Sequence, residues 1–173
     1  MAPTKVKCFT WQVVKRACLT HHEVLQKKGR VVVTRYFLCN GTGETNNHLF
    51  LHCKFTTQLW NLFLSFTKTE WTMREHTADL MSFWMRRGGG KSQKKWRRLI
   101  PSCIWWTFGR ERNQRCFEDK SISLQRLKIN CLVLIYFWRI HEYPQEAEDS
   151  RFLLLFEAVS GLRVNWGKTV VSL

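Results

Sequence analysis

The sequence predicts a small, mainly α-helical domain with at most a short strand or hairpin. Three observations support this expectation. In several stretches apolar residues recur every three or four positions, which is the spacing of one helix face. The one strand that we predict is short, the β-branched run Val31, Val32 and Val33. No apolar run approaches the roughly 20 residues that cross a bilayer, so we expect no membrane partner.

The predicted helices follow one another along residues 1–142. The first apolar face holds Val6, Phe9, Val13 and Ala17. A capping box at Thr20 predicts a short second helix. Two further faces are Leu59, Leu62, Phe63 and Phe66, and then Leu80, Met81 and Trp84 with Thr77 as N-cap. The last two are residues 96–108, with Pro101 at a kink or a start, and residues 127–138, with Ser121 or Ser123 as cap. We expect the core to include Phe9, Trp60, Phe63, Trp105 and Leu134.

The charge of the chain favours a polyanionic partner. Twenty-eight Lys and Arg residues oppose thirteen acids, which gives a net charge of +15. A field of this sign attracts nucleic acid or an anionic membrane surface. Residues 85–98 hold three glycines and seven basic residues, which predicts an exposed basic loop entering a helix. The candidate phosphate contacts, which together form the basic face, are Arg86, Arg87, Lys94, Lys95, Arg97 and Arg98.

The most informative side chains are Cys39, His48 and Cys53, which flank a turn rich in Gly and Asn. Thiolates and an imidazole around such a turn are typical of a small zinc knuckle, although a structural zinc site has four ligands. Residues five apart on an α-helix diverge, so either the helix begins after His48 or His52 replaces a ligand. On spacing alone such a trio is more often coincidental, with Cys53 in the core and His48 as a satisfied polar residue.

Two series of residues in register carry a resemblance to a known family. The first contains Pro3, Lys5, Phe9, Trp11, Leu19, Thr20, Cys39, Glu44, Thr45, residues 48–53, Leu59 and Trp60. The second contains Trp105, Trp106, Phe108, Glu111, Arg112, Asn113, Phe117 and Glu118. Over about residues 1–140 the chain resembles the zinc-binding domain at the C-terminal end of reverse transcriptases from plant LINE-type (non-LTR) retrotransposons.

This resemblance implies a set of zinc ligands. The family's knuckle, Cys-x2-Cys-x8-His-x4-Cys, falls on Tyr36, Cys39, His48 and Cys53. Three of the four positions match, so Cys39, His48 and Cys53 are the expected ligands. Tyr36 stands where the family has its first cysteine, and a phenol is seldom a zinc ligand. We therefore expect a degraded zinc site with incomplete occupancy.

Residues 143–173 are predicted to be a separate part of the chain, a linker followed by a displaced fragment. Residues 153–168 resemble a segment of the polymerase domain of the same elements, which normally lies upstream of the zinc domain. Polymerase chemistry needs clustered carboxylates that hold two Mg²⁺ ions. The three aspartates are widely scattered at Asp79, Asp119 and Asp149, so we expect no enzyme.

The leading functional hypothesis is a non-catalytic, retrotransposon-derived zinc-knuckle module that binds RNA or DNA non-specifically through its basic face. One alternative is a structural or interaction module that packs against a polymerase domain in trans. The other is a decayed fragment with no selected activity. The first seven residues hold no apolar signal region, so we expect an intracellular protein, without distinguishing nucleus from cytoplasm. The seven cysteines, an odd number, are then expected to be reduced, which excludes a disulfide scaffold.

Overall fold

The computed structural model describes residues 2–18, 38–39, 45–70, 74–86, 97–142, 154–155, 157–159 and 161. Across these residues the regular secondary structure is all helical, which confirms the predicted fold class. The elements are α1 (Thr4–Val14), the π-helical turn η1 (His48–His52), α3 (Lys54–Phe66), α4 (Thr77–Arg86), α6 (Leu99–Phe117) and α7 (Leu124–Glu142). The helix expected after Thr20 and the strand expected at residues 31–33 lie outside the described residues.

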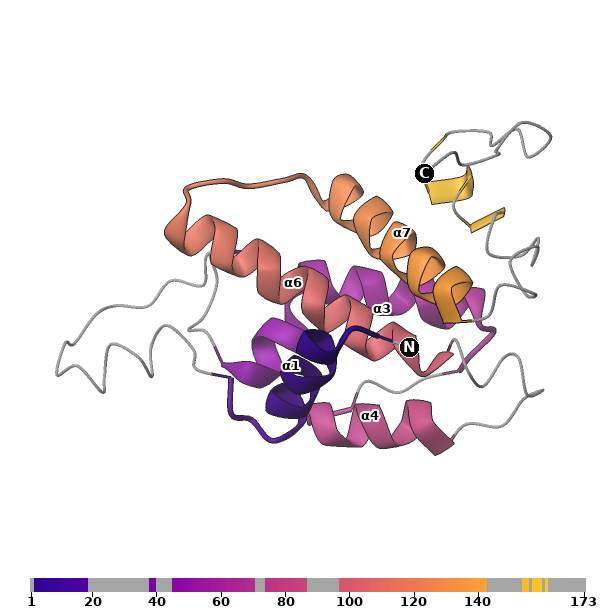
Figure 1. The fold of residues 1–173 in the computed structure, drawn as a ribbon, viewed down its shortest axis with the longest axis horizontal. Coiled ribbons are helices and arrows are strands. Elements are labelled where there is room, and N and C mark those ends of the chain that lie inside the picture. Colours follow the sequence, from indigo (N-terminus) through magenta and orange to yellow (C-terminus); the bar gives the residue numbers. More distant parts are fainter. Residues whose placement is uncertain are drawn as a thin grey trace, which may run out of the picture.

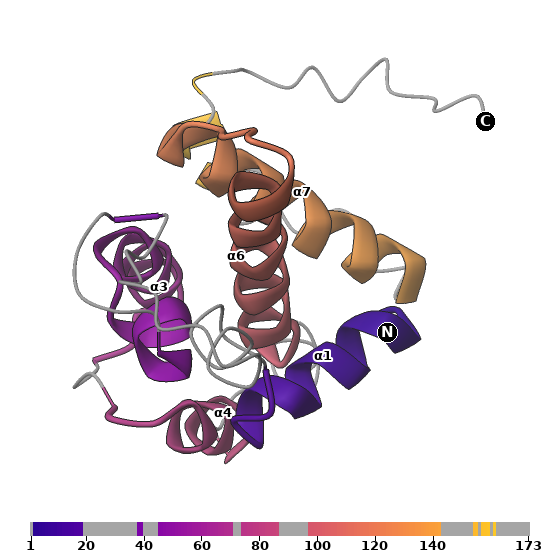
Figure 2. The ribbon, with the colours of Figure 1, turned by 90° about the vertical axis from the view of Figure 1, so that its left-hand side faces the viewer.

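Helix α6 is the centre of the fold (Figure 1). Helices α1, α3 and α7 pack against different sides of it, and α4 packs against α1, as Figure 2 shows. Every residue of α6 from Leu99 to Gly109 is buried except the half-buried Trp106. A helix enclosed in this way is buried around its whole circumference, instead of presenting a single apolar stripe.

The contact between α1 and α6 depends on a glycine. A Cβ atom at Gly109 would lie 2.6 Å from Cζ of Phe9, so a larger residue would push the two helices apart. The Phe9 ring also makes edge contacts with Phe50 and Trp106, at centroid distances of 5.8 and 5.6 Å. Ala17, expected on the same face as Phe9, lies beyond the end of α1 and is exposed.

Three helix starts test the predicted signals. Pro101 lies in the first turn of α6, where its missing N–H is not needed, so it marks the start of the helix. Ser123 caps α7, since its Oγ accepts from the Arg126 amide at 3.2 Å. Thr77 is not the N-cap of α4. It is the first residue of that helix, and its hydroxyl donates to the Val13 carbonyl of α1 at 3.1 Å.

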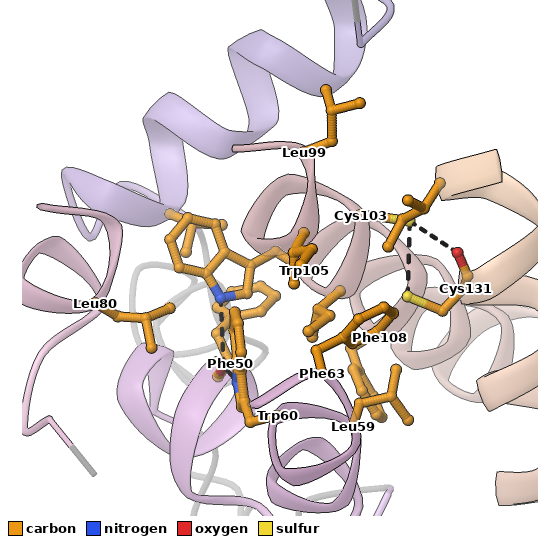
Figure 3. Packing of buried hydrophobic residues seen from close by; sticks show 14 of the residues in the cluster. Phe50, Leu59, Trp60, Phe63, Leu80, Leu99, Cys103, Trp105, Phe108 and Cys131 are labelled. Carbon is orange, nitrogen blue, oxygen red and sulfur yellow. Dashed lines mark hydrogen bonds between the residues drawn. The ribbon is translucent and has the colours of Figure 1, made fainter. Parts of the chain in front are cut away.

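The predicted core residues lie in the core or against it, and Figure 3 shows three of them, Trp60, Phe63 and Trp105. Trp60, Phe63 and Trp105 are completely buried, while Phe9 and Leu134 are half-buried and pack on the same cluster. The indoles of Trp60 and Trp105 meet edge to face at a centroid distance of 6.4 Å. Aromatic edge contacts of this kind add to the stabilisation from buried area. Three of the five predicted residues are therefore in the core, and the other two lie at its edge.

Two buried thiols join α6 to α7. The Sγ atoms of Cys103 and Cys131 lie 3.6 Å apart, and the Cys103 thiol donates to the Cys131 carbonyl at 3.3 Å. Burial, reinforced by the neighbouring thiol, raises the pKa of Cys103 well above its usual value. Both cysteines are free, so the contact is between two cysteine side chains and not a disulfide bond.

A buried carboxylate fixes the turn between α6 and α7. Oε1 of Glu111 accepts from Nε of Arg115 at 2.6 Å and from the Ile122 amide at 3.1 Å. Arg115 also donates to the Ile122 carbonyl at 3.0 Å. A buried carboxylate needs charged and N–H partners, and this turn supplies both to Oε1 of Glu111.

Residues 143–173 are described only in part. Leu155 and Val159 pack against the core cluster, and the Gln125 side chain donates to the Val159 carbonyl. The predicted boundary at residue 142 stays a prediction. Among the described residues, no helix is both long and apolar enough to cross a membrane.

Candidate metal centre

The three predicted ligands converge. Sγ of Cys39, a ring nitrogen of His48 and Sγ of Cys53 all lie within 4.8 Å of one another. Sγ of Cys39 is 3.2 Å from Nε2 of His48. Cys53 is completely buried, whereas Cys39 and His48 are half-buried. The group therefore has a closed side in the core and a side nearer to solvent.

A π-helical turn brings His48 and Cys53 together. The Cys53 amide donates to the His48 carbonyl at 2.7 Å, which closes an i to i+5 ring. This wider turn returns Cys53 towards His48, whereas an α-helix would turn residues five apart away from each other. The regular helix α3 then begins at Lys54. The α-helix does begin after His48, as one of the two predicted arrangements had it, but His48 itself opens a π-helical turn that the sequence did not predict.

Two tryptophans hold the middle of η1. The Phe50 carbonyl accepts from Nε1 of Trp60 at 3.0 Å and from Nε1 of Trp105 at 3.3 Å (Figure 3). Both indoles are completely buried, and a buried Trp N–H normally finds a partner. Residues from α3 and α6 thus satisfy a carbonyl that the π-helical turn leaves without a regular α-helical partner.

Two threonines of α3 hold the neighbouring carbonyls of η1. The Thr56 hydroxyl donates to the Leu49 carbonyl at 2.8 Å, and the Thr57 hydroxyl donates to the Leu51 carbonyl at 3.1 Å. Thr56 is completely buried. Sequence reasoning missed these threonines and the role of the two tryptophans. The available signal was a set of polar side chains at positions that helical spacing assigns to the core.

The residues before η1 attach the site to α1. Thr45 caps the turn, since its Oγ1 accepts from the His48 amide at 3.1 Å. The Asn46 side chain donates to the Val13 carbonyl at 2.9 Å. Nδ2 of Asn47 lies 3.0 Å from Nδ1 of His76. The segment that carries His48 is therefore held from both α1 and the start of α4.

His52 is not part of the converging group. Its Nε2 donates to the Glu75 carbonyl at 3.2 Å, and the residue is exposed. The structure therefore gives no support to His52 as a replacement ligand. Tyr36, the fourth position of the expected motif, lies outside the described residues.

The donor set suits zinc. Two thiols and one imidazole are soft and borderline ligands of the kind that structural zinc sites use. Tetrahedral zinc with ordinary Zn–S and Zn–N bonds separates its ligand atoms by about 3.6–3.8 Å. The 3.2 Å contact and the 4.8 Å limit bracket that separation, so small side-chain rotations fit the group to the ion.

Comparison with known families agrees with this geometry. Residues 1–60 match the family model for zinc-binding in reverse transcriptase. The matched segment contains all three converging side chains and the Trp60 that supports η1. The predicted resemblance to reverse transcriptase zinc-binding domains is thereby confirmed over these residues. Searches of the curated proteins and of the solved structures gave no significant match.

Only some of the basic residues that we predicted to contact phosphate lie among the described residues. Arg86 ends α4 and Arg98 precedes α6, and both are exposed. Arg97 is half-buried and donates to the Thr67 carbonyl at 3.4 Å, so part of its guanidinium faces the protein. The other three basic candidates lie outside the described residues: Arg87, Lys94 and Lys95.

Proposed function

We propose that this chain is a non-catalytic, retrotransposon-derived zinc-binding module that binds RNA or DNA non-specifically through a basic face. The observation that carries the proposal is the convergence of Cys39, His48 and Cys53 within the segment that matches the reverse transcriptase family. An origin in a plant LINE-type element and an intracellular site of action, in nucleus or cytoplasm, are part of this proposal.

Zinc has a structural role in the proposal. Cys39 would bind it from the loop before η1, while His48 and Cys53 would bind it from the two ends of the π-helical turn. When bound, the ion supplies a strong cross-link between a loop and a helix start. Tyr36 stands in the first ligand position, so occupancy should be weaker than at a closed four-ligand site.

The basic face supplies the affinity for nucleic acid. Exposed Arg86 and Arg98 lie at the two ends of the basic segment that follows α4. With a net charge of +15, the chain should release counterions from phosphates and bind with little sequence preference. The proposal assigns no catalytic step, since Asp79 lies on α4, Asp119 follows α6 and Glu111 is engaged in the α6–α7 turn.

One observation favours the second candidate, an interaction module that packs against a polymerase domain in trans. Val133 and Phe137 lie one turn apart on α7, and they are 42% and 68% exposed. An exposed apolar pair on a helix is typical of a protein contact surface. A module of this kind would bind no nucleic acid by itself, which separates the two candidates.

The test is the salt dependence of binding to RNA and DNA. The proposal expects micromolar or weaker affinity that falls steeply as salt rises. Replacing Lys94, Lys95, Arg97 and Arg98 with Ala should weaken binding for every sequence and flatten the salt slope. The matched control removes four exposed or half-exposed lysines elsewhere: Lys54, Lys68, Lys120 and Lys128. Equal losses in both variants would refute a defined basic face, and no binding by the wild type would refute nucleic-acid binding.

A further inference from the structure

One tryptophan departs from the packing of the others. Trp11, on α1, is 61% exposed. The other tryptophans in the described parts of the chain are buried or half-buried. A Trp side chain carries a large apolar surface that normally enters a core or an interface. Its exposure on a well-packed helix therefore points to a ligand.

Lysines flank Trp11 on the same face of α1. Lys7 and Lys15 stand four residues before and after it, which places them beside it on the helix surface. Both lysines are exposed, while Val6 and Val13 on the opposite face are completely buried. The two lysines are about 12 Å apart along the helix axis, with the indole between them.

The surroundings of this face are also basic. No acidic residue precedes Glu23 in the chain. Lys5 is exposed on α1 with its Nζ 5.7 Å from the centre of the Trp106 ring, and Arg110 is exposed one turn further along α6. These exposed cations favour an anionic partner such as phosphate.

The composition of the face distinguishes nucleic acid from a membrane surface. A helix that lies in a membrane interface presents a broad apolar face. On α1 the large exposed apolar side chain is Trp11, and its exposed neighbours are the smaller Cys8 and the polar Lys7, Gln12 and Lys15. A single aromatic between cations is instead the arrangement that stacks on a nucleic-acid base.

We propose that the outer face of α1, formed by Lys7, Trp11 and Lys15, binds single-stranded nucleic acid. A base stacks on the Trp11 indole while the two lysines contact the flanking phosphates. The strand must be single because duplex bases are already stacked on each other. RNA and DNA share this chemistry. The inference rests on the proposed function and adds to it a surface and a strand preference.

The face is coupled to the metal centre. The Val13 carbonyl, near the end of α1, accepts from Asn46, which lies two residues before His48. It also accepts from Thr77 at the start of α4. These bonds hold α1 against the turn that carries the ligands, so the stacking face keeps a defined orientation to the zinc site.

The experiment measures binding of the full chain to labelled single strands of about 12 nucleotides and mixed sequence, RNA and DNA in separate arms. Trp11→Leu should weaken binding roughly 5- to 150-fold in at least one arm, while Trp11→Phe should recover most of it. Phe137→Leu is the matched control, since it removes an exposed aromatic from α7, and it should bind like the wild type. Thermal unfolding of each variant confirms that the helices are retained.

The lysines have their own readout. Lys7→Gln with Lys15→Gln should make the negative slope of log K against log salt shallower by about 1.4, whereas Trp11→Leu should leave the slope unchanged. The charge-matched control is Lys54→Gln with Lys120→Gln, both exposed and away from α1, and it should retain the slope. Equal slope changes in the two double variants would overturn the assignment of the lysines.

The remaining outcomes separate this inference from the proposed function. One outcome is that Trp11→Leu binds the oligonucleotides as tightly as the wild type does, while the Lys94, Lys95, Arg97 and Arg98 variant binds them more weakly. This outcome would overturn binding at the α1 face and retain binding at the basic face. No binding by the wild type would overturn both. Vesicles of anionic lipid form the last arm. If Trp11→Leu lost vesicle binding while binding both oligonucleotides normally, α1 would be a membrane contact and the inference would be wrong.

Discussion

Removing one of two neighbouring histidines tests the metal centre most directly. His48 and His52 occupy the two ends of the same π-helical turn. Only His48 has its Nε2 beside Cys39, while His52 donates to the Glu75 carbonyl. His48→Ala therefore removes a proposed ligand, and His52→Ala is its matched control.

The expected size follows from linkage between binding and folding. Zinc at one hundred times its Kd stabilises the folded chain by about 2.7 kcal/mol, because it binds the native group and not the unfolded chain. For a chain of this length each kcal/mol raises Tm by roughly 2–4 °C, which gives an increase of about 5–11 °C. His48→Ala leaves two of the three proposed ligands, so the increase should fall below about 2 °C.

The assay is thermal unfolding of each protein in a zinc buffer and in chelator. The quantity compared is the difference in Tm between the two conditions, so any stability that a substitution removes from the metal-free fold cancels. Wild type and His52→Ala should show the same zinc-dependent increase. Equal loss in His48→Ala and His52→Ala, or no zinc-dependent increase in the wild type, would refute the assignment of the ligands.

Three further outcomes are expected. Tyr36→Cys should raise both bound zinc and Tm, because it supplies a fourth ligand and a negative charge, and equal full zinc occupancy in wild type and variant would contradict the degraded site. Trp60→Phe and Trp105→Phe each leave the Phe50 carbonyl one hydrogen-bond donor, whereas the double variant leaves it none. The free energy of unfolding of the double variant, measured by chemical denaturation, should therefore fall by about 1 kcal/mol more than the sum of the two single losses. Additive losses would argue against the shared carbonyl. The raised pKa of Cys103 keeps the thiol protonated in the folded state above pH 9.0, where the unfolded thiol ionises. The free energy of unfolding should therefore fall as pH rises beyond that value, by up to about 1.4 kcal/mol per pH unit. Cys103→Ala should flatten that fall, and an unchanged pH profile in the variant would contradict it.

The helices and their buried faces were predictable from the sequence because helical spacing depends only on local chemistry. Pro101 and Ser123 mark helix starts for the same local reason, since one lacks an N–H and the other offers a capping oxygen. The convergence of Cys39, His48 and Cys53 was predictable from residue types, spacing and the family pattern. The family pattern also showed that Tyr36 stands in the position of the first cysteine. The spacing of residues within a helix or turn would not show this difference.

What the sequence by itself determined, then, is a helical chain with a cysteine–histidine group and a basic excess. Only the tertiary structure decided how η1 is wound, because its carbonyls are satisfied by Trp60 and by Trp105, which lies far along the chain. It likewise decided that Thr77 donates to α1 instead of capping α4, and that Trp11 faces outward while Trp105 lies in the core. Periodicity identifies an apolar face, but whether another element covers a given side chain depends on contacts between residues distant in sequence.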